Sequence, residues 1–287
     1  MADPMHNNSR LRSVAKLVVP RPVRNFLRSP QRTARWLKNE GAYVMGYRPA
    51  VRLHGDWTLR CHPVSYPMFR TFEVEDEFRA ELDGFVTYCA QNMMLLDIGA
   101  SFGFFSLAAL HFGGDGARVV AVDPSATSHR ILRANLRLSG VVDRVQVIEA
   151  AVGKDDGVLP MLTAGPAGEH YLVAASSDRT DASAIRQYSI PSLLDVTAFP
   201  ATHLKIDVEG FEAEVIEGAM SFLCSRRPII FLELHGDFLR QRQLEPVDVL
   251  RKLGECGYNR LERHGKSIDA AEAAKLPIAR LVCLSRK

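Results

Sequence analysis

The sequence predicts an α/β fold whose doubly wound, mostly parallel sheet has about seven strands. Short apolar runs that end at an acidic residue recur along the chain, and all but the run at 145–148 are followed by a segment with helical periodicity. One of them, residues 93–96, leads into the glycine-containing turn 97–103 and then into a helical segment from Phe104. Strands that alternate with helices form parallel sheets, and a strand, glycine turn and helix in succession are typical of nucleotide-binding sheets.

The other elements follow from periodicity and from end signals. Ser125 is a suitable N-cap for the second core helix and Gly140 a suitable stop. Helices are expected at residues 76–90, from 104 to the glycines at 113 and 114, and at 125–140, around 211–223 and around 247–253. Strands are expected at residues 57–61, 93–97, 118–123, 145–148, 203–208, 229–234, 258–261 and 281–284. An inserted β-hairpin region is expected at about 153–200, with strand-like pieces at 158–162, 171–175 and 187–190.

Charge divides the chain into two parts. Residues 1–53 hold 11 Lys or Arg against Asp3 and Glu40, a net charge of +9, whereas residues 54–287 hold 25 against 31 acidic residues, a net charge of −6. We therefore expect a basic, helical N-terminal extension (1–53) before one catalytic domain (54–287). The extension could form a basic amphipathic segment that contacts an anionic membrane or a polyanion, or a helical cap with solvated arginines. Prolines at positions 20, 22 and 30 would break any long helix in it.

Composition also excludes some classes of protein. No apolar run is long enough to span a bilayer, and no secretion signal is present, so we expect a cytoplasmic protein with at most peripheral membrane contact. The cysteines are odd in number and never in C-x-x-C spacing, which argues against a disulfide framework and a zinc site and suits a reducing cytosol. They are Cys61, Cys89, Cys224, Cys256 and Cys283. No motif indicates a nucleic-acid partner, and the oligomeric state stays open.

The glycine turn indicates which nucleotide is bound. Gly99 and Gly103 stand four residues apart with Ser101 between them, so the third glycine of the dinucleotide fingerprint is missing. No neighbouring Lys or Arg and no G-K-[ST] motif is present to hold a phosphate. S-adenosylmethionine, which has a ribose but no phosphate, fits better, and Asp97 suits its positively charged amino acid part. The alternative is a turn that needs its glycines for steric reasons alone.

Acidic residues fall where the predicted strands end. They are Asp97, Asp123, Glu149, Asp207 and Glu233. Ligands of such sheets bind at the carboxyl ends of the strands. Asp123 lies 20 residues beyond Gly103, where an acidic residue accepts hydrogen bonds from ribose hydroxyls. Its alternative role is to cap the helix that follows.

The segment 204–212 alternates polar and apolar residues and then breaks at a glycine. Strand periodicity places Lys205, Asp207 and Glu209 on one side near the strand end. Because charged side chains are costly in a core, we expect a site there and not a core. Glu212 is expected to favour the helix N-terminus electrostatically.

Five blocks of sequence together resemble the FkbM-type methyltransferases over about residues 70–236. They are D-x-G-A-x-x-G at 97–103, A-V-D-P at 121–124, E-A-A-V-G at 149–153, K-I-D-V-E-G-F-E at 205–212 and E-L-H at 233–235. The resemblance implies S-adenosylmethionine as methyl donor and, most often, a hydroxyl oxygen on a sugar or natural product as acceptor. It implies cofactor binding by Asp97, Gly99, Ala100, Ser101, Gly103, Asp123, Glu149, Ala151 and Asp207. Ser101 stands where the family usually has Asn, and Asp123 where it often has Glu; both changes keep the polar character.

Methyl transfer to an alcohol is helped by a base that removes the hydroxyl proton. His235 is the best candidate, because the unperturbed pKa of histidine lies near neutral pH. Asp207 or Glu233 would orient that imidazole or the acceptor hydroxyls. The alternative for His235 is a strand-end histidine bonded to a carbonyl. Asp207, Glu209 and Glu233 could also bind Mg²⁺ through their oxygens, although nothing in the sequence fixes that geometry.

Other functions and the acceptor remain open. One alternative is a non-catalytic adaptor that keeps the cofactor fold and is recruited through its basic extension. Another is an NAD-dependent oxidoreductase, which the missing third glycine disfavours. We expect the insertion and residues 64–75 to form the acceptor pocket, but no pattern distinguishes a sugar from a glycan, a glycolipid or a natural product.

Overall fold

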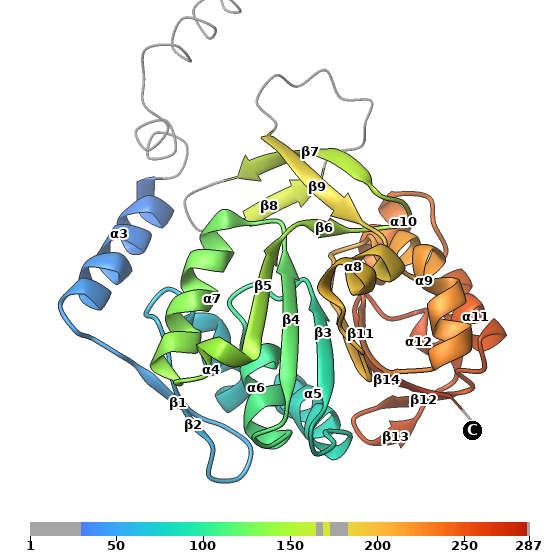
Figure 1. Cartoon of the computed structure of the whole chain (residues 1–287), viewed down its shortest axis with the longest axis horizontal. Helices are drawn as coiled ribbons and strands as arrows, with labels where there is room; N and C mark the ends of the chain where they lie inside the picture. The colour runs from blue at the N-terminus through green and yellow to red at the C-terminus, as the bar shows by residue number, and fades with distance from the viewer. Residues whose placement is uncertain (1–29, 165–168, 173–182, 286–287) are drawn as a thin grey trace, which may run out of the picture.

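The computed structural model describes residues 30–164, 169–172 and 183–285. At its centre lies an eight-stranded sheet in the order β13-β12-β14-β11-β10-β3-β4-β5 (Figure 1). The strands are β3 (Met94–Ile98), β4 (Arg118–Asp123), β5 (Val145–Glu149), β10 (His203–Ile206), β11 (Ile229–Leu234), β12 (Arg260–Arg263), β13 (Lys266–Ser267) and β14 (Ala279–Leu284). Strands β5, β4, β3, β10 and β11 run parallel, and β14 is antiparallel to β11. The predicted α/β class with a mostly parallel sheet is confirmed, and the two-residue β13 adds an eighth strand.

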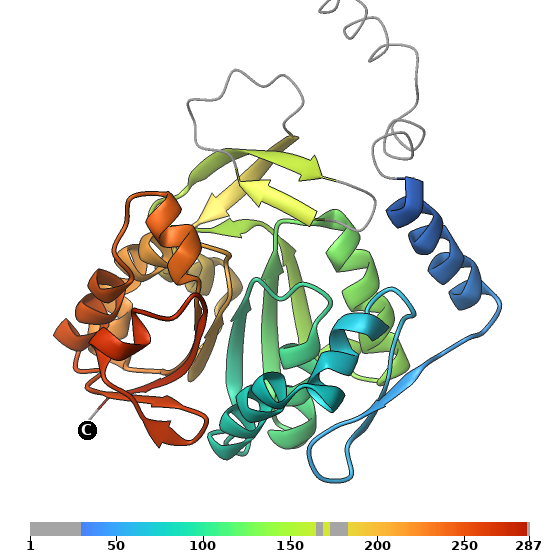
Figure 2. The ribbon, with the colours of Figure 1, turned by 180° about the vertical axis from the view of Figure 1, so that it is seen from behind.

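Helices cover both faces of this sheet (Figures 1 and 2). One face carries α4 (Tyr66–Val74), α5 (Asp76–Thr87), α6 (Phe104–Phe112) and α7 (Ala126–Leu138); the other carries α8 (Ile190–Thr197), α9 (Glu212–Arg226), α10 (Gly236–Gln241), α11 (Pro246–Glu255) and α12 (Ala270–Ala273). Successive strand residues point to opposite faces of the sheet. Leu95 therefore packs in the core on the face that carries α4 to α7, and Leu96 in the core on the other face. Among the described residues, no helix combines the length and the apolar character that crossing a membrane requires.

The strand order reverses between β3 and β10. The chain passes from β3 to β4 and β5 at one edge, and later adds β10 on the opposite side of β3. The connections that leave these two strands therefore diverge. In open α/β sheets ligands bind at this switch point, outside the carboxyl ends of the strands.

The insertion forms a separate four-stranded sheet in the order β6-β9-β7-β8. Its strands are β6 (Ala151–Val152), β7 (Gly157–Ala164), β8 (Glu169–Leu172) and β9 (Ser183–Tyr188), and Figure 1 shows it beyond the ends of β4 and β5. The piece expected at 158–162 lies in β7, and the piece at 171–175 extends outside the described residues. The strand expected at 187–190 is wrong beyond Tyr188, because Ser189 caps α8 by accepting a hydrogen bond from the backbone N–H of Ser192.

The N-terminal extension contains a helix and part of a hairpin. Helix α3 (Pro30–Val44) has a proline in its first turn, where proline is tolerated. Residues 1–29, with the prolines at 20 and 22, lie outside the described residues, so the expectation that the prolines break a long helix stays a prediction. Strand β2 (Thr58–Arg60) is present as predicted, but it pairs with β1 (Ala50–Arg52) and not with the main sheet. The division at residue 53 stays a prediction.

Two cysteines are paired, which corrects the expectation from the sequence. Cys224 in α9 and Cys256 at the end of α11 form a disulfide, whereas Cys61, Cys89 and Cys283 are free. The neighbouring residues Leu223 and Leu253 pack in one core, which brings the two helices together. The spacing of 32 residues carries no such signal, because only helix packing makes the two cysteines neighbours.

We expect the Cys256→Ser variant to lose about 3 to 4 kcal/mol of unfolding free energy, the chain-entropy value for a loop of this size. Guanidinium unfolding without reductant measures the loss, and Cys89→Ser, at a free cysteine, is the matched control. A thiol assay on the unfolded wild type should detect three thiols. Detection of five, or equal loss in both variants, would contradict the pairing.

Candidate active site

The glycine turn lies directly against the end of β10. Gly99 and Gly103 have φ angles of +78° and +86°, in the left-handed region that favours glycine. A Cβ on Gly99 would overlap the carbonyl oxygen of Asp207, and a Cβ on Gly103 would overlap the side chain of Leu132. Both glycines are therefore required by backbone angle and by close approach. At Gly99 this approach joins the predicted donor turn to the end of β10.

Two buried carboxylates support the turn. Asp97 Oδ2 accepts a hydrogen bond from Ser106 Oγ at 2.6 Å. Asp123 accepts one from the backbone N–H of Ser101 at 2.9 Å and another from that of Ser125 at 2.8 Å, one on each oxygen. Burial raises the pKa of both carboxyls to about 6. Asp123 thus fastens the turn to the start of α7, and Ser125 itself supplies the N-cap.

The other predicted cofactor residues flank the same edge. Glu149 ends β5 opposite Asp123, and its side chain is half exposed, with Oε2 3.9 Å from Nδ1 of His129. Ala100 is buried in the turn, and Ala151 is buried in β6. The half-exposed carboxylate of Glu149 is therefore free to accept a hydrogen bond from a ligand beyond this edge.

His235 lies among three carboxylates at the end of β11. Its Nδ1 is 2.8 Å from Glu212 Oε1, and its Nε2 is 3.8 Å from both Asp207 Oδ1 and Glu233 Oε1. Glu212 is fully buried and also accepts the backbone N–H of Gly210. Nδ1 therefore carries the proton that Glu212 accepts, and the Nε2 lone pair of the neutral ring faces Asp207 and Glu233. Burial lowers the pKa of His235, but the hydrogen bond to Glu212 and the nearby negative charges raise it by more.

Lys205 lies beside this group in the protein interior. Its Nζ is 3.4 Å from Glu81 Oε1 and 3.8 Å from both Asp207 Oδ2 and Glu233 Oε2. Arg280 of β14 contacts Glu81 at 2.9 Å and Glu233 at 2.8 Å. Burial lowers the pKa of Lys205, but these carboxylates raise it by more, and burial raises the pKa of Glu81 to about 7. The expectation that Lys205 cannot be interior is wrong, because neighbouring charges compensate its burial.

Strand β10 ends at Ile206, two residues earlier than predicted. Glu209 is exposed and has a φ angle of +47°, so strand periodicity does not extend to it. Of the described residues, Asp207, Glu233 and His235 are the group that brings one ligand atom each within 4.8 Å of one another. Glu209, which the sequence placed among the metal candidates, is not part of this group.

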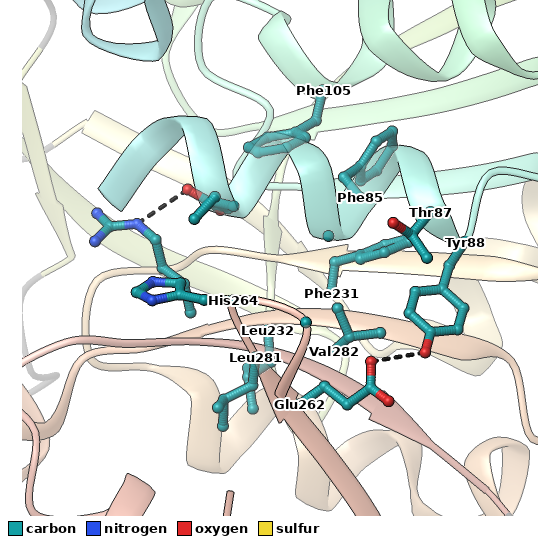
Figure 3. Close-up of a pocket in the computed structure, with 15 residues that line it drawn as sticks. Phe85, Thr87, Tyr88, Phe105, Phe231, Leu232, Glu262, His264, Leu281 and Val282 are labelled. Carbon is teal, nitrogen blue, oxygen red and sulfur yellow. Dashed lines mark hydrogen bonds and ion pairs between the residues drawn. The ribbon is translucent and has the colours of Figure 1, made fainter. Parts of the chain in front are cut away.

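A small cavity lies between α5 and the strands β11 and β14, and Phe105, two residues after the glycine turn, also lines it (Figure 3). Its volume is about 40 Å³, and its lining includes Phe85, Phe231 and Val282. At one end Tyr88 donates a hydrogen bond to Glu262 at 2.7 Å. A cavity of this size holds only a few water molecules, so it is neither a donor nor an acceptor pocket.

A comparison with known protein families identifies the domain. The model of the methyltransferase FkbM domain matches residues 97–260, more than half of the chain. The chain belongs to the FkbM methyltransferase family. The matched range begins at Asp97, the first residue of the glycine turn, and includes Asp123, Asp207 and His235.

Several solved structures match this FkbM-family chain at low sequence identity. An FkbM methyltransferase from Methylobacillus flagellatus is 18% identical over 60% of this chain, with a TM-score of 0.39, and the match spans 48% of that protein, about half its length. A precorrin-6y C5,15-methyltransferase from Geobacter metallireducens is 18% identical over 66% of this chain and 74% of its own, with a TM-score of 0.39. An S-adenosylmethionine-dependent O-methyltransferase from Thermotoga maritima is 11% identical over 69% and 58%, with a TM-score of 0.39. A search of curated proteins found no match.

Three residues of this FkbM-family site were not identified as site residues from the sequence. Glu212, expected only to favour the helix N-terminus, orients His235. Its place five residues after Asp207, in a segment already assigned to the site, is a signal that could have revealed it. Glu81 and Arg280 come from α5 and β14, and no local pattern connects elements so far apart in the chain.

Proposed function

We propose that this FkbM-family chain transfers a methyl group from S-adenosylmethionine to a hydroxyl oxygen of a sugar, glycan, glycolipid or natural-product acceptor. The observation that carries the proposal is the contact of the glycine turn with the end of β10, where Gly99 leaves no room for a Cβ against Asp207. It sets the donor turn beside the group that contains His235, Asp207 and Glu233. Donor-binding and proton-accepting residues are thus neighbours.

The residues of the donor turn fit S-adenosylmethionine. When bound, this cofactor supplies an electrophilic methyl group on a positively charged sulfur. Asp97 and Asp207 place carboxylates at the switch point, which favours a cationic ligand. Each oxygen of Asp123 accepts one backbone N–H and keeps a second lone pair, with which it would accept the ribose hydroxyls. Glu149, at the end of the neighbouring strand β5, would accept a hydrogen bond from the adenine ring of the cofactor.

His235 would act as the general base. Glu212 holds the Nδ1 proton, so Nε2 is free to accept the proton of the acceptor hydroxyl as its oxygen bonds to the methyl carbon and the carbon–sulfur bond breaks. The resulting imidazolium would be stabilised by Glu212, Asp207 and Glu233. Most of the rate would come from holding the acceptor in line with the donor and excluding water. We propose that the acceptor binds between residues 64–75 and the four-stranded sheet of the insertion.

The same three ligand atoms make a divalent cation a second candidate. Asp207, Glu233 and His235 fit an ion that accepts mixed oxygen and nitrogen ligands. Lys205 and Arg280 already lie against the two carboxylates, so we propose a reaction that needs no metal. A turnover rate that falls with EDTA and returns with Mg²⁺ would contradict this part of the proposal.

Calorimetric titration tests the donor. We expect S-adenosylhomocysteine to bind and NAD to show no heat of binding, because the turn lacks the third glycine of the dinucleotide fingerprint. Binding of NAD alone would overturn the proposal in favour of an oxidoreductase. Binding of S-adenosylhomocysteine with no methyl transfer to any saccharide, glycolipid or polyketide alcohol would favour the adaptor, and transfer to RNA would place the acceptor in another class.

A further inference from the structure

Helix α3 exposes an apolar stripe and is followed by exposed apolar residues. Ala34, Leu37, Gly41 and Val44, spaced three, four and three residues apart, share one side of the helix and are all exposed. Val44 is 82% exposed and Met45, just after the helix, is 85% exposed. The helix turns other residues toward the body of the protein, including Thr33 and Glu40. An apolar stripe that faces away from the core of a domain is a feature of interaction surfaces.

Exposed basic residues lie on α3 itself and on the neighbouring α7. Figures 1 and 2 both show α3 beside α7, and Glu40 of α3 forms an ion pair with Arg130 of α7. Helix α7 contains no acidic residue, and its three arginines are exposed. Among the ion pairs of the described residues, none involves Arg133 or Arg137 of α7 or Arg35 or Lys38 of α3. We call Arg35, Lys38, Arg133, Arg137 and the apolar residues Leu37, Val44 and Met45 the α3–α7 face.

We propose that the α3–α7 face docks on a membrane surface that contains anionic phospholipid. Leu37, Val44 and Met45 would enter the boundary between headgroups and acyl chains, and the arginines would contact lipid phosphates. A helix that combines exposed apolar residues with flanking basic residues is suited to this boundary. Residues 1–29, just before α3 in the chain, carry six more Lys or Arg and one acidic residue, so the sequence that precedes this helix is also basic.

The apolar stripe is what favours a lipid over a nucleic acid. A phosphodiester backbone would be bound by the basic residues alone, and exposed aliphatic side chains would add nothing to that contact. In a lipid bilayer both kinds of residue are used, because the charges attract the surface and the aliphatic groups insert into it. The proposal does not depend on methyl transfer, so it can fail without affecting the proposed reaction.

Vesicle sedimentation of the full chain tests this proposal. We expect binding to vesicles of phosphatidylcholine mixed with phosphatidylglycerol, weak binding to phosphatidylcholine alone, and weakening as salt increases. The charge variant R133E/R137E should lower the partition coefficient by at least roughly tenfold. Its control is K266E/K275E, which makes the same change in net charge at exposed lysines near β13 and α12. The apolar variant L37Q/V44Q should bind less than V196Q, whose valine in α8 is 64% exposed.

Several outcomes would overturn the proposal. Equal binding to neutral and anionic vesicles would exclude the electrostatic part, and equal loss in the control variants would show that the α3–α7 face is not the contact. Binding to an RNA homopolymer with no binding to vesicles would assign the face to nucleic acid. A dimer that L37Q/V44Q dissociates, again with no vesicle binding, would make it a contact between two copies of the chain. Because all the substituted residues are exposed, thermal unfolding should be unchanged, so lost binding would not reflect lost folding.

Discussion

His235→Ala should lower kcat by roughly 10²- to 10⁴-fold, the usual contribution of a general base, while S-adenosylhomocysteine still binds with nearly unchanged affinity. The separation is expected because His235 Nε2 faces Asp207 and Glu233, whereas the proposed donor contacts lie on the glycine turn and at Asp123. Turnover with a saturating acceptor and calorimetric titration measure the two effects. His54→Ala is the matched control, since that histidine is partly exposed and pairs with Asp83.

The pH dependence adds a second criterion to the same experiment. The base must be neutral, so activity should fall as the pH drops through the pKa of His235, which Glu212 and the other carboxylates hold above its ordinary value. Glu212→Gln removes one of these charges and should shift the acid limb to lower pH. Because Glu212 is buried, thermal unfolding of this variant must show that it is folded. Unchanged turnover in His235→Ala, or an acid limb that Glu212→Gln leaves in place, would remove the pair from the proposed roles.

Gly99→Ala should abolish measurable binding of S-adenosylhomocysteine, a loss of at least roughly 100-fold. The new Cβ would overlap the carbonyl oxygen of Asp207, and the left-handed backbone angle itself costs on the order of 1 kcal/mol for a residue with a side chain. The turn and the end of β10 would have to separate, which would deform the proposed donor site. Calorimetric titration measures the affinity, and circular dichroism monitors the fold.

Gly265→Ala separates the two causes of this loss. Gly265 has a φ angle of +68°, but no atom lies within 4 Å of the position that its Cβ would take. It therefore reports the backbone cost without any overlap, at a site far from the glycine turn. If Gly99→Ala binds S-adenosylhomocysteine as well as Gly265→Ala does, close approach to Asp207 has no part in binding.

The fold class could be predicted from the sequence because the core strands are apolar runs that end in polar residues. The runs that became β3, β4 and β11 are buried on both faces, so their composition alone identified them. Short elements were missed where local chemistry outweighed periodicity. Helix α8 was not predicted, and the expected strand at 187–190 included its first residue, Ile190. The cap at Ser189 and the proline at 191 are weaker signals than the β-branched and aromatic residues before them.

The candidate site was predictable in its polar residues but not in their pairings. Asp207, Glu233 and His235 were expected to be neighbours because the carboxyl ends of parallel strands meet, and they lie within 4.8 Å of one another. Burial of Lys205 was not predictable, since it depends on Glu81 and on Arg280, which reach it from other parts of the chain. The pairing of His235 with Glu212 depends on how α9 begins after β10, which strand periodicity does not describe.

The insertion leaves and rejoins the core through a short parallel ladder, in which Ala151 is opposite Gln187 and Val152 is opposite Tyr188. Its two ends are therefore adjacent, and the described strands between them, β7, β8 and β9, pair with no strand of the main sheet. Such an arrangement tolerates insertions, deletions and exchange of the intervening segment without altering the register of the core. Under the proposed reaction, the insertion could change between relatives while the glycine turn stays constant, so a chimera that exchanges residues 153–186 between relatives would test whether the insertion sets acceptor preference.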